Sequence, residues 1–145
     1  MSLTIFKCKN SFLSNFTLCE LRYKDIDFIS IEQAYQWGKA ENLKDKEAIL
    51  KCKSSKESKK IGHSIKCDIK KWDLNKEKVM YELLKIKFAN DNLKRMLIET
   101  GDLELIETNY WHDLYWSNCM CYKCKEIPSK NIHGKLLMKI RDELI

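Results

Sequence analysis

Three polar side chains recur at helical spacing early in the chain. Glu32, Gln36 and Lys39 stand at positions i, i+4 and i+7, which places them on one side of a helix. They flank Tyr35, which belongs to the apolar stripe that should enter the core. A carboxylate, an amide and an amine turned inward together can transfer protons, form hydrogen bonds and attack a bound substrate. The alternative interpretation is an exposed Glu-Gln-Lys ridge.

Two further cations fall on stripes that should face inward. Lys87 and Arg141 each share a predicted helix face with apolar residues, namely Met80, Leu83, Leu84 and Phe88 for the first and Leu137, Ile140 and Leu144 for the second. Either cation alone can extend its charged group to solvent. Three polar intrusions on three helices instead indicate a polar pocket covered by helices, because buried charges persist only when paired or bound to a ligand.

Aromatic and acidic residues gather in the segment 104–116, Glu-Leu-Ile-Glu-Thr-Asn-Tyr-Trp-His-Asp-Leu-Tyr-Trp. The segment follows neither the strand period nor the helix period throughout, which predicts a functional loop. Trp111, Tyr115 and Trp116 can stack on a nucleic-acid base, and Glu107 and Asp113 can handle protons or hydroxyl groups. The alternative is an aromatic cluster in the core with its acids turned outward.

The segment Asn131-Ile-His-Gly134 precedes the last predicted helix. Free backbone N–H groups at a helix N-terminus form a natural phosphate site, and Gly134 permits close approach of a ligand. Ordinary helix capping by Asn131 explains the same residues.

Three cysteines stand close together in the pattern Cys119-x-Cys121-x-x-Cys124, with His112 and His133 nearby in the sequence. These ligand types suit zinc, but typical structural sites use paired Cys-x-x-Cys motifs, so a fourth ligand would have to come from a histidine. The alternative is a reduced, cysteine-rich surface loop. We therefore expect no metal and no cofactor.

The elements that must position these residues are mainly helical. The pattern over 18–31 predicts a hairpin around an Asp25-Ile26-Asp27 turn, and Ser30 is expected to cap a helix that continues to about residue 50. Further helices are expected over 55–62, 75–89, 92–99 and 134–144, with Gly101 ending the fourth. The expected fold class is mainly α with a small β-hairpin near the N-terminus, in a single domain over residues 1–145.

Composition narrows the functional classes. The chain has 145 residues, 44% of them hydrophobic and 33% charged, with a formal net charge of +6 and one proline, so disorder and a multidomain assembly are excluded. The start lacks a signal-peptide pattern, and no apolar stretch approaches a membrane span, so we expect a cytoplasmic protein without a membrane partner. Seven cysteines in such a chain are expected to be reduced thiols.

The order of motifs along the chain resembles the NADAR family, the YbiA-like N-glycosidases. The matching segments cover nearly the whole chain: Phe12-Leu-Ser-Asn-Phe16, Ser30 to Ala40, Lys60-Ile-Gly62, Trp72, Lys78-Val-Met80, Lys87-Phe88, Leu97 to Asp102, Leu105-Ile-Glu107, Asp113-x-x-Trp116, Asn131 and Gly134 to Arg141. The resemblance implies a mainly α-helical YbiA-like domain that cleaves an N-glycosidic bond to ribose. The substrate classes that it implies are phosphoribosylamino-pyrimidine intermediates of riboflavin synthesis and ADP-ribose attached to nucleobases, including guanine in DNA.

Site residues follow from the resemblance position by position. Glu32, Gln36 and Lys39 match the family's Glu-x-x-x-Gln-x-x-Lys helix motif, and Asp113 matches the acid of its Asp-x-x-Trp pair. The resemblance implies catalytic roles for Glu32, Lys39 and Asp113, and substrate contacts from the other matching positions: Asn15, Phe16, Gln36, Trp72, Lys87, Trp116, Asn131, Gly134 and Arg141. The chain departs from the family pattern at His63, where arginine is frequent, and at Ser117, where glycine is frequent.

Breaking a C1′–N bond builds positive charge on the ribose, so the site needs negative charge or a nucleophile near C1′ and a proton for the leaving base. In one hypothesis Glu32 or Asp113 activates water and the other carboxyl group orients the ribose or donates the proton. In a second, a desolvated Lys39 amine forms a Schiff base with the opened sugar while Glu32 moves protons. Two alternatives without catalysis are a module that binds ADP-ribose or a nucleotide and a bundle in which the inward charges form internal salt bridges.

Overall fold

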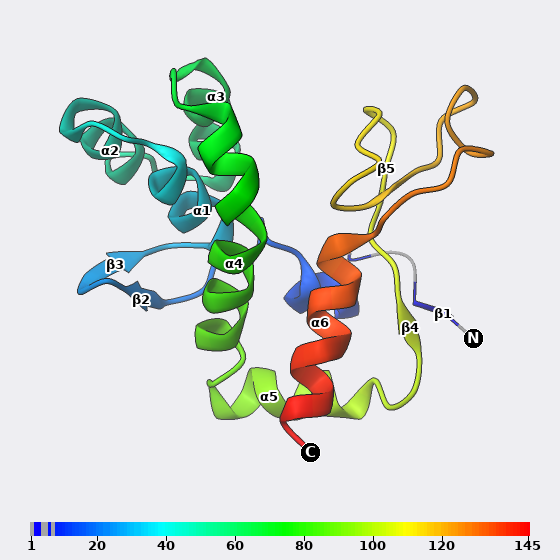
Figure 1. The fold of residues 1–145 in the computed structure, drawn as a ribbon. Coiled ribbons are helices and arrows are strands. Elements are labelled where there is room, and N and C mark those ends of the chain that lie inside the picture. The colour runs from blue at the N-terminus through cyan, green and yellow to red at the C-terminus, as the bar shows by residue number, and fades with distance from the viewer. Residues whose placement is uncertain (1, 4–5, 7) are drawn as a thin grey trace. The chain divides into compact units, whose positions relative to one another are not determined.

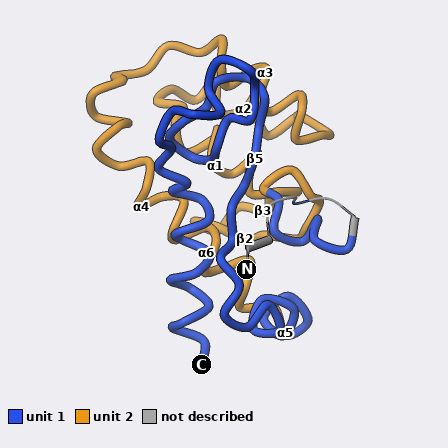
Figure 2. The backbone as a smooth tube through the Cα atoms, turned by 90° about the vertical axis from the view of Figure 1, so that its right-hand side faces the viewer, with its two compact units in different colours: residues 1–14, 91–145 blue, residues 15–90 orange. Residues whose placement is uncertain are grey.

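The chain consists of two compact units. The computed structural model describes residues 2–3, 6 and 8–145. One unit comprises residues 15–90 and the other residues 1–14 with 91–145 (Figure 2). The prediction that residues 1–145 form one domain is not tested by this division and stays a prediction.

A β-hairpin opens the unit 15–90. Strands β2 (Leu21–Tyr23) and β3 (Ile26–Phe28) pair antiparallel, with Leu21 opposite Phe28. Lys24 and Asp25 form the turn with φ values of 51° and 64°, as expected for a two-residue hairpin turn. The predicted hairpin is thus confirmed, with its turn one residue earlier than expected.

The helix predicted from Ser30 to residue 50 is in fact two helices. Helix α1 (Ile31–Lys39) begins as predicted, since the Ser30 hydroxyl accepts a hydrogen bond from the Gln33 N–H, but it ends at Ala40, whose ψ is 137°. Helix α2 (Leu43–Leu50) starts anew because the Asn42 side chain accepts from the Asp45 N–H. Asn42 is therefore the N-cap that starts a second helix, although the apolar periodicity alone predicts one continuous helix.

Two more helices complete the unit 15–90. Helix α3 (Ser55–Ser64) is capped by Ser54. Helix α4 (Ile69–Lys87) begins six positions before the predicted start because Asp68 caps it by accepting from the Lys71 N–H. Within this unit α1 packs against α2, α3, α4 and β3, so it is the helix around which the others assemble (Figure 1).

The unit of residues 1–14 and 91–145 has shorter elements. A 3₁₀ helix η1 (Cys8–Leu13) precedes α5 (Asp91–Glu99), and α6 (Ile132–Glu143) closes the chain. Gly101 follows α5 with a φ of 62°, as predicted for a glycine that ends a helix. Two short parallel pairs, β1 (Ser2–Leu3) with β4 (Glu104–Leu105) and β5 (Thr108–Asn109) with β6 (Asn118–Cys119), were not predicted, because two-residue strands carry no readable period.

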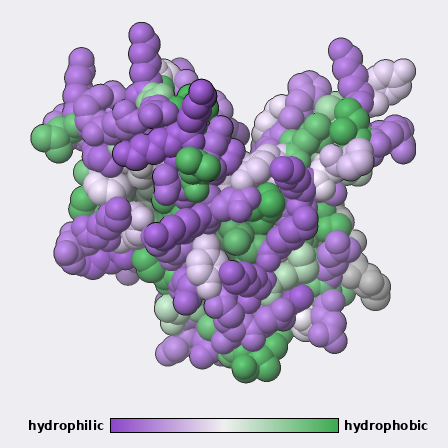
Figure 3. All heavy atoms as spheres, in the orientation of Figure 1, coloured by the Kyte–Doolittle hydropathy of each residue, from purple (hydrophilic) through white to green (hydrophobic). Residues whose placement is uncertain are grey.

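Each unit buries its own apolar residues. Ile31, Ile49, Leu83, Leu84 and Phe88 are fully buried in one unit, and Leu13, Leu97, Leu105 and Leu137 in the other. Hydrophilic side chains gather over α2 and α3 in Figure 3. Among the described residues no helix is both long enough and apolar enough to cross a membrane.

Lys46 joins the end of α1 to α2. Its Nζ lies 3.8 Å from the centre of the Trp37 ring and donates a 2.8 Å hydrogen bond to the Trp37 carbonyl, and its burial lowers the pKa of the amine below its ordinary value. We expect Lys46→Ala to lower the free energy of unfolding by about 1–2 kcal/mol through loss of the cation–π contact and the helix-end charge. Denaturant unfolding measures this, with Lys44→Ala at an exposed position of the same helix as the control. Equal stability of the two variants would contradict it.

Candidate functional site

The polar face of α1 points inward, as predicted. Glu32 is 9% exposed and Gln36 is 4% exposed, and the Gln36 Nε2 donates a 2.9 Å hydrogen bond to the Glu32 Oε1. An exposed ridge is therefore the wrong interpretation for these two residues. The amide fixes one carboxylate oxygen, which holds Glu32 in one orientation.

Asn15 lies beside the start of α1. The Glu32 N–H donates to the Asn15 carbonyl over 3.1 Å, and the Asn15 Nδ2 contacts the Met80 sulfur at 3.7 Å. Two buried acceptors, the Asn15 Oδ1 and the Gln36 Oε1, have no hydrogen-bond partner among the described residues. Buried polar atoms are nearly always satisfied in folded proteins, so these two oxygens are suited to receive hydrogen bonds from a ligand.

Lys39 lies at the far end of the same face. It is half-buried, and its Nζ donates a 2.8 Å hydrogen bond to the Gly62 carbonyl of α3. A Cβ at Gly62 would overlap the Gln36 side chain, so only glycine lets α3 approach α1 this closely. The close approach positions both Gln36 and Lys39.

Aromatic and basic residues adjoin Lys39. Phe16 is 40% exposed, and the Lys59 Nζ lies 5.5 Å from the centre of its ring. The Ser55 hydroxyl donates to the Phe16 carbonyl over 2.8 Å. Burial, followed by the charges of Lys59 and Lys39, lowers the pKa of His63 below its ordinary value. An exposed ring with cations around it is the composition that binds a base and a phosphate.

Trp72 and Lys87 also belong to the unit 15–90. Trp72 lies in the first turns of α4, and its ring meets Tyr35 of α1 edge to face at a centroid distance of 5.1 Å. Lys87 is 3% exposed, with its Nζ 5.3 Å from the centre of the Phe88 ring. The inward placement of Lys87 is thus confirmed.

Asp113 lies in the other unit, where it organises a turn. Its Oδ1 accepts hydrogen bonds from the N–H groups of Tyr115 and Trp116, at 2.9 and 3.0 Å. The Asn109 Nδ2 donates to the Asp113 carbonyl. These two backbone donors hold the carboxyl group in one orientation. The Tyr115 and Trp116 rings pack edge to face at 5.1 Å.

Asn131 does not cap α6 with its side chain. It has a left-handed φ of 49° and makes no side-chain cap bond. Instead its Oδ1 accepts from the Glu107 N–H and its Nδ2 donates to the Leu105 carbonyl. The predicted capping role is wrong because Asn131 ties the helix start to the segment after β4.

The predicted phosphate site at the start of α6 is also occupied in part by the chain itself. The N–H groups of Ile132 and His133 donate to the carbonyls of Tyr115 and Trp116. A Cβ at Gly134 would overlap the Leu105 carbonyl and the Asn131 side chain, so this glycine serves close packing within its own unit.

Arg141 is buried as predicted, with 6% of its surface exposed. Its Nη1 donates to the Thr100 hydroxyl at 2.8 Å and to the Leu103 carbonyl at 2.9 Å. These contacts hold the turn that follows α5.

Comparisons with known proteins show the family of this chain. The NADAR domain matches residues 5–145. The chain belongs to the NADAR domain family. The solution structure of the Escherichia coli protein YbiA superposes with a TM-score of 0.81 at 27% identity, covering 99% of this chain and 86% of that one. The YbiA-like fold expected from the sequence is confirmed.

Curated relatives of this NADAR chain carry enzymatic names. An N-glycosidase of Acanthamoeba polyphaga mimivirus is 28% identical over 81% of the chain and 75% of the relative. An N-glycosidase of Nostoc punctiforme is 28% identical over 90% of the chain and 83% of the relative. A chloroplastic riboflavin biosynthesis protein of Arabidopsis thaliana is 37% identical over 51% of the chain but only 12% of its own length.

The NADAR chain also has a buried pair whose contact the sequence did not predict. The His133 Nδ1 lies 2.6 Å from the Glu107 Oε2, and His133 is fully buried, with its ring edge to face with Phe6 at 5.7 Å. The sequence suggests Glu107 as a proton carrier and His133 as a candidate metal ligand. No spacing rule links residues 26 positions apart, so only the fold reveals their contact.

Residues of the cysteine motif do come together in the structure. Cys119, Cys121 and Cys124 lie around His112, and the ligand atoms of all four are within 4.8 Å of one another. The loop thus brings the three cysteines and His112 together.

A shallow pocket of about 350 Å³ lies elsewhere in the unit 15–90. Its lining is mostly apolar and includes Leu18, Phe28 and Ile29 beside the hairpin. It contains none of the predicted site residues, so we place the candidate site on the polar face of α1 and not in this pocket.

Proposed function

We propose that this NADAR protein is an N-glycosidase that hydrolyses the bond between a base and a phosphorylated ribose. The protein is an enzyme of the hydrolase class that acts on N-glycosyl bonds, in line with the names of its two relatives that match over most of their length. The observation that carries the proposal is the buried Glu32 carboxylate. The Gln36 amide holds this carboxylate, which shares its helix face with Lys39. The buried oxygens Asn15 Oδ1 and Gln36 Oε1 have no partner among the described residues.

The polar face of α1 is suited to bind the ribose of the substrate. The unpartnered oxygens of Asn15 and Gln36 can accept hydrogen bonds from ribose hydroxyl groups, which orients C1′ toward Glu32. A carboxylate near C1′ stabilises the positive charge that develops as the C1′–N bond breaks. Phe16 and Trp72 supply aromatic surface for the base.

Lys39 supplies the nucleophile. Its amine attacks C1′ while the C1′–N bond to the base breaks, and the Glu32 carboxylate transfers a proton from the attacking amine to the leaving base. Ring opening breaks the bond between C1′ and the ring oxygen, moves the remaining amine proton to that oxygen and yields a Schiff base between the Nζ and the sugar. Water then adds to the Schiff base, and the sugar leaves as the free aldehyde while the amine is restored.

In the alternative route Glu32 activates water for direct attack on C1′, and Lys39 only contacts the substrate.

Residues of the other unit are proposed to contribute substrate contacts. Asp113 remains the second candidate carboxyl group, Trp116 a candidate for stacking on the base, and Asn131, Gly134 and Arg141 candidates for substrate binding. Lys87, which belongs to the unit 15–90, is a further candidate for substrate binding. Because the Oδ1 of Asp113 is engaged by two backbone N–H groups, we assign proton transfer to Glu32 and the positioning of substrate hydroxyl groups to Asp113.

The proposed substrates are an ADP-ribosylated nucleobase, including guanine in DNA, and a phosphoribosylamino-pyrimidine of riboflavin synthesis. The match to the riboflavin biosynthesis protein supports the second class. The charge of Lys59 beside His63 provides part of the positive environment that phosphate groups require.

His63 reports on where the phosphate binds. Burial and, after it, the neighbouring cations lower its pKa, so a bound phosphate dianion is expected to raise the pKa by compensating the charge of these cations. Because the imidazole then gains a proton on binding, ADP-ribose should bind more tightly as the pH falls through this pKa. NMR titration of His63 with and without saturating ADP-ribose measures the shift. An unchanged His63 pKa at saturation would place the phosphate elsewhere.

A substrate panel tests the function directly. The protein is incubated with ADP-ribosylated guanine DNA and with the phosphoribosylamino-pyrimidine, and chromatography detects released base and free sugar. We expect release from at least one substrate. Binding without release from any of the substrates would favour a module that only binds ADP-ribose or a nucleotide.

A further inference from the structure

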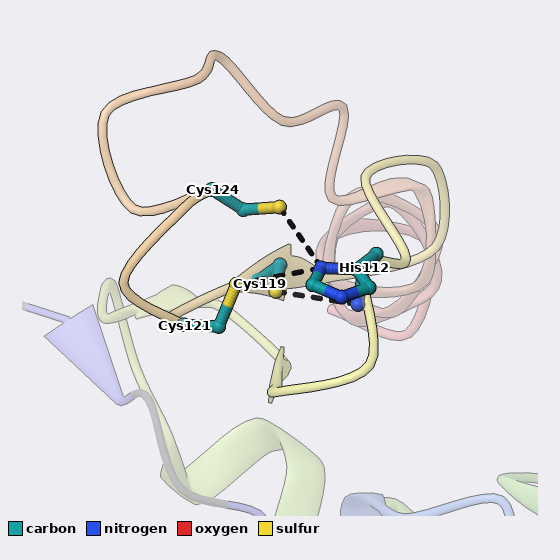
Figure 4. Close-up of side chains that lie close together, drawn as sticks. All are labelled: His112, Cys119, Cys121 and Cys124. Atoms are coloured by element: carbon teal, nitrogen blue, oxygen red, sulfur yellow. Dashed lines mark hydrogen bonds between the residues drawn. The ribbon is translucent and has the colours of Figure 1, made fainter.

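A compact cluster of metal-ligating side chains lies within residues 112–124. His112 follows β5, Cys119 belongs to β6, and Cys121 and Cys124 lie in the loop after it (Figure 4). One ligand atom of each residue lies within 4.8 Å of every other. The imidazole and the three thiols point toward one another in this view.

The distances in the cluster fit a tetrahedral metal site. The His112 Nδ1 lies 3.2 Å from the Cys124 sulfur and 3.4 Å from the Cys121 sulfur. Zinc bonds of about 2.3 Å to sulfur and about 2.0–2.1 Å to nitrogen place a tetrahedral N···S edge at about 3.5 Å and an S···S edge at about 3.8 Å. The two N···S distances are therefore within a few tenths of an ångström of the tetrahedral edge, and the other ligand atoms lie within 4.8 Å of one another.

Local backbone geometry assembles the four ligands. Pairing of β5 with β6 sets Asn109 opposite Cys119, which brings the two ends of the segment together. His112 has a φ of 71°, and its N–H donates to the Cys119 sulfur over 3.3 Å. A tight turn, in which the Cys121 carbonyl accepts from the N–H groups of Cys124 and Lys125, folds the last two cysteines back.

We propose that His112, Cys119, Cys121 and Cys124 bind one structural Zn²⁺ ion. Three thiolates and one imidazole form a donor set of the Cys₃His type, which selects zinc over the hard cations that prefer oxygen. Each thiol that binds gives up its proton to solvent. All four tetrahedral positions are taken by the protein, so the ion has no open position for a substrate and serves the fold.

The segment around the cluster needs such a constraint. The segment 120–131 contains no helix or strand, and much of its apolar surface is exposed: Met120 by 47%, Tyr122 by 90% and Ile127 by 47%. A segment that buries so little apolar surface gains little stability from packing. A metal ion that crosslinks His112 to Cys124 would supply the stability that packing does not provide.

Metal content and cobalt spectroscopy test the site. The full chain is purified with a reductant, equilibrated with Zn²⁺ and freed of excess, and its zinc is measured by native mass spectrometry. We expect one Zn²⁺ per chain, and Co²⁺ in its place should give thiolate charge-transfer and tetrahedral ligand-field bands. Cys121→Ser and Cys124→Ser should each weaken binding by more than about 100-fold, whereas Cys67→Ser, outside the cluster, should bind like wild type.

The metal content and Co²⁺ spectrum of the wild-type protein test the proposal even if a cysteine variant fails to fold. Absence of bound zinc in the reduced wild type, iron in its place, a Co²⁺ spectrum without thiolate bands, or undiminished binding in both cluster variants would overturn the proposal. Chelator should lower the melting temperature of the zinc-loaded wild type and of Cys67→Ser. The metal-content readout is independent of glycosidase activity, so failure of either proposal is recognised separately.

Discussion

Glu32→Gln is expected to lower kcat of base release by about 10²–10⁴-fold, the usual contribution of a positioned acid or base. The substitution keeps the shape of the side chain but removes its charge and its ability to give up a proton. Because the variant replaces a buried carboxylate by a neutral amide, the melting temperature should not fall. Single-turnover assays on whichever substrate of the panel is cleaved measure the rate, and thermal unfolding measures the stability.

Glu20→Gln is the matched control for this prediction. Glu20 is an exposed acid of the same unit, so its substitution should leave both the rate and the melting temperature at the wild-type value. The interpretation of Glu32 as part of an internal salt bridge makes the opposite forecast. A loss of stability in Glu32→Gln with full activity would establish that interpretation and reject the catalytic role.

Lys39→Arg is expected to reduce turnover on the order of 10³-fold or more, because a guanidinium keeps its charge and cannot act as a nucleophile. Borohydride added during turnover of the wild type should reduce the Schiff base to a stable amine and leave a sugar adduct on Lys39. Peptide mass spectrometry locates the adduct and gives its mass.

Lys60→Arg is the control for the lysine prediction, since Lys60 is exposed on α3, two positions before Gly62. It should retain wild-type turnover and show the same adduct on Lys39. Full activity in Lys39→Arg without any adduct in the wild type would exclude the covalent route and leave direct attack by water, with Glu32 as the general base.

Much of the α1 site was predictable because it depends on local periodicity. Positions i, i+4 and i+7 of one helix lie on one face whatever surrounds the helix, so the grouping of Glu32, Gln36 and Lys39 needed only the N-cap at Ser30. The hairpin and the end of α5 at Gly101 were predictable for the same reason, since a turn or cap depends on a few adjacent residues.

Helix boundaries were predicted less well where capping signals competed with periodicity. The apolar pattern continued through Ala40, but Asn42 and Asp68 each accept a backbone N–H and start a helix there. A single side-chain cap contributes about 1 kcal/mol, which is enough to decide where a helix begins when the apolar pattern permits several starting points.

The sequence alone determined the helical character of this protein, its family resemblance and the inward-facing chemistry of α1, because these depend on residue type and short spacing. Only the tertiary structure decided which distant groups meet. In the tertiary structure His133 contacts Glu107, and the Asn131 side chain donates to the Leu105 carbonyl and does not cap the helix. His112 lies in the cysteine cluster. Contacts between residues far apart in the chain depend on how the elements pack, and no local period encodes that packing.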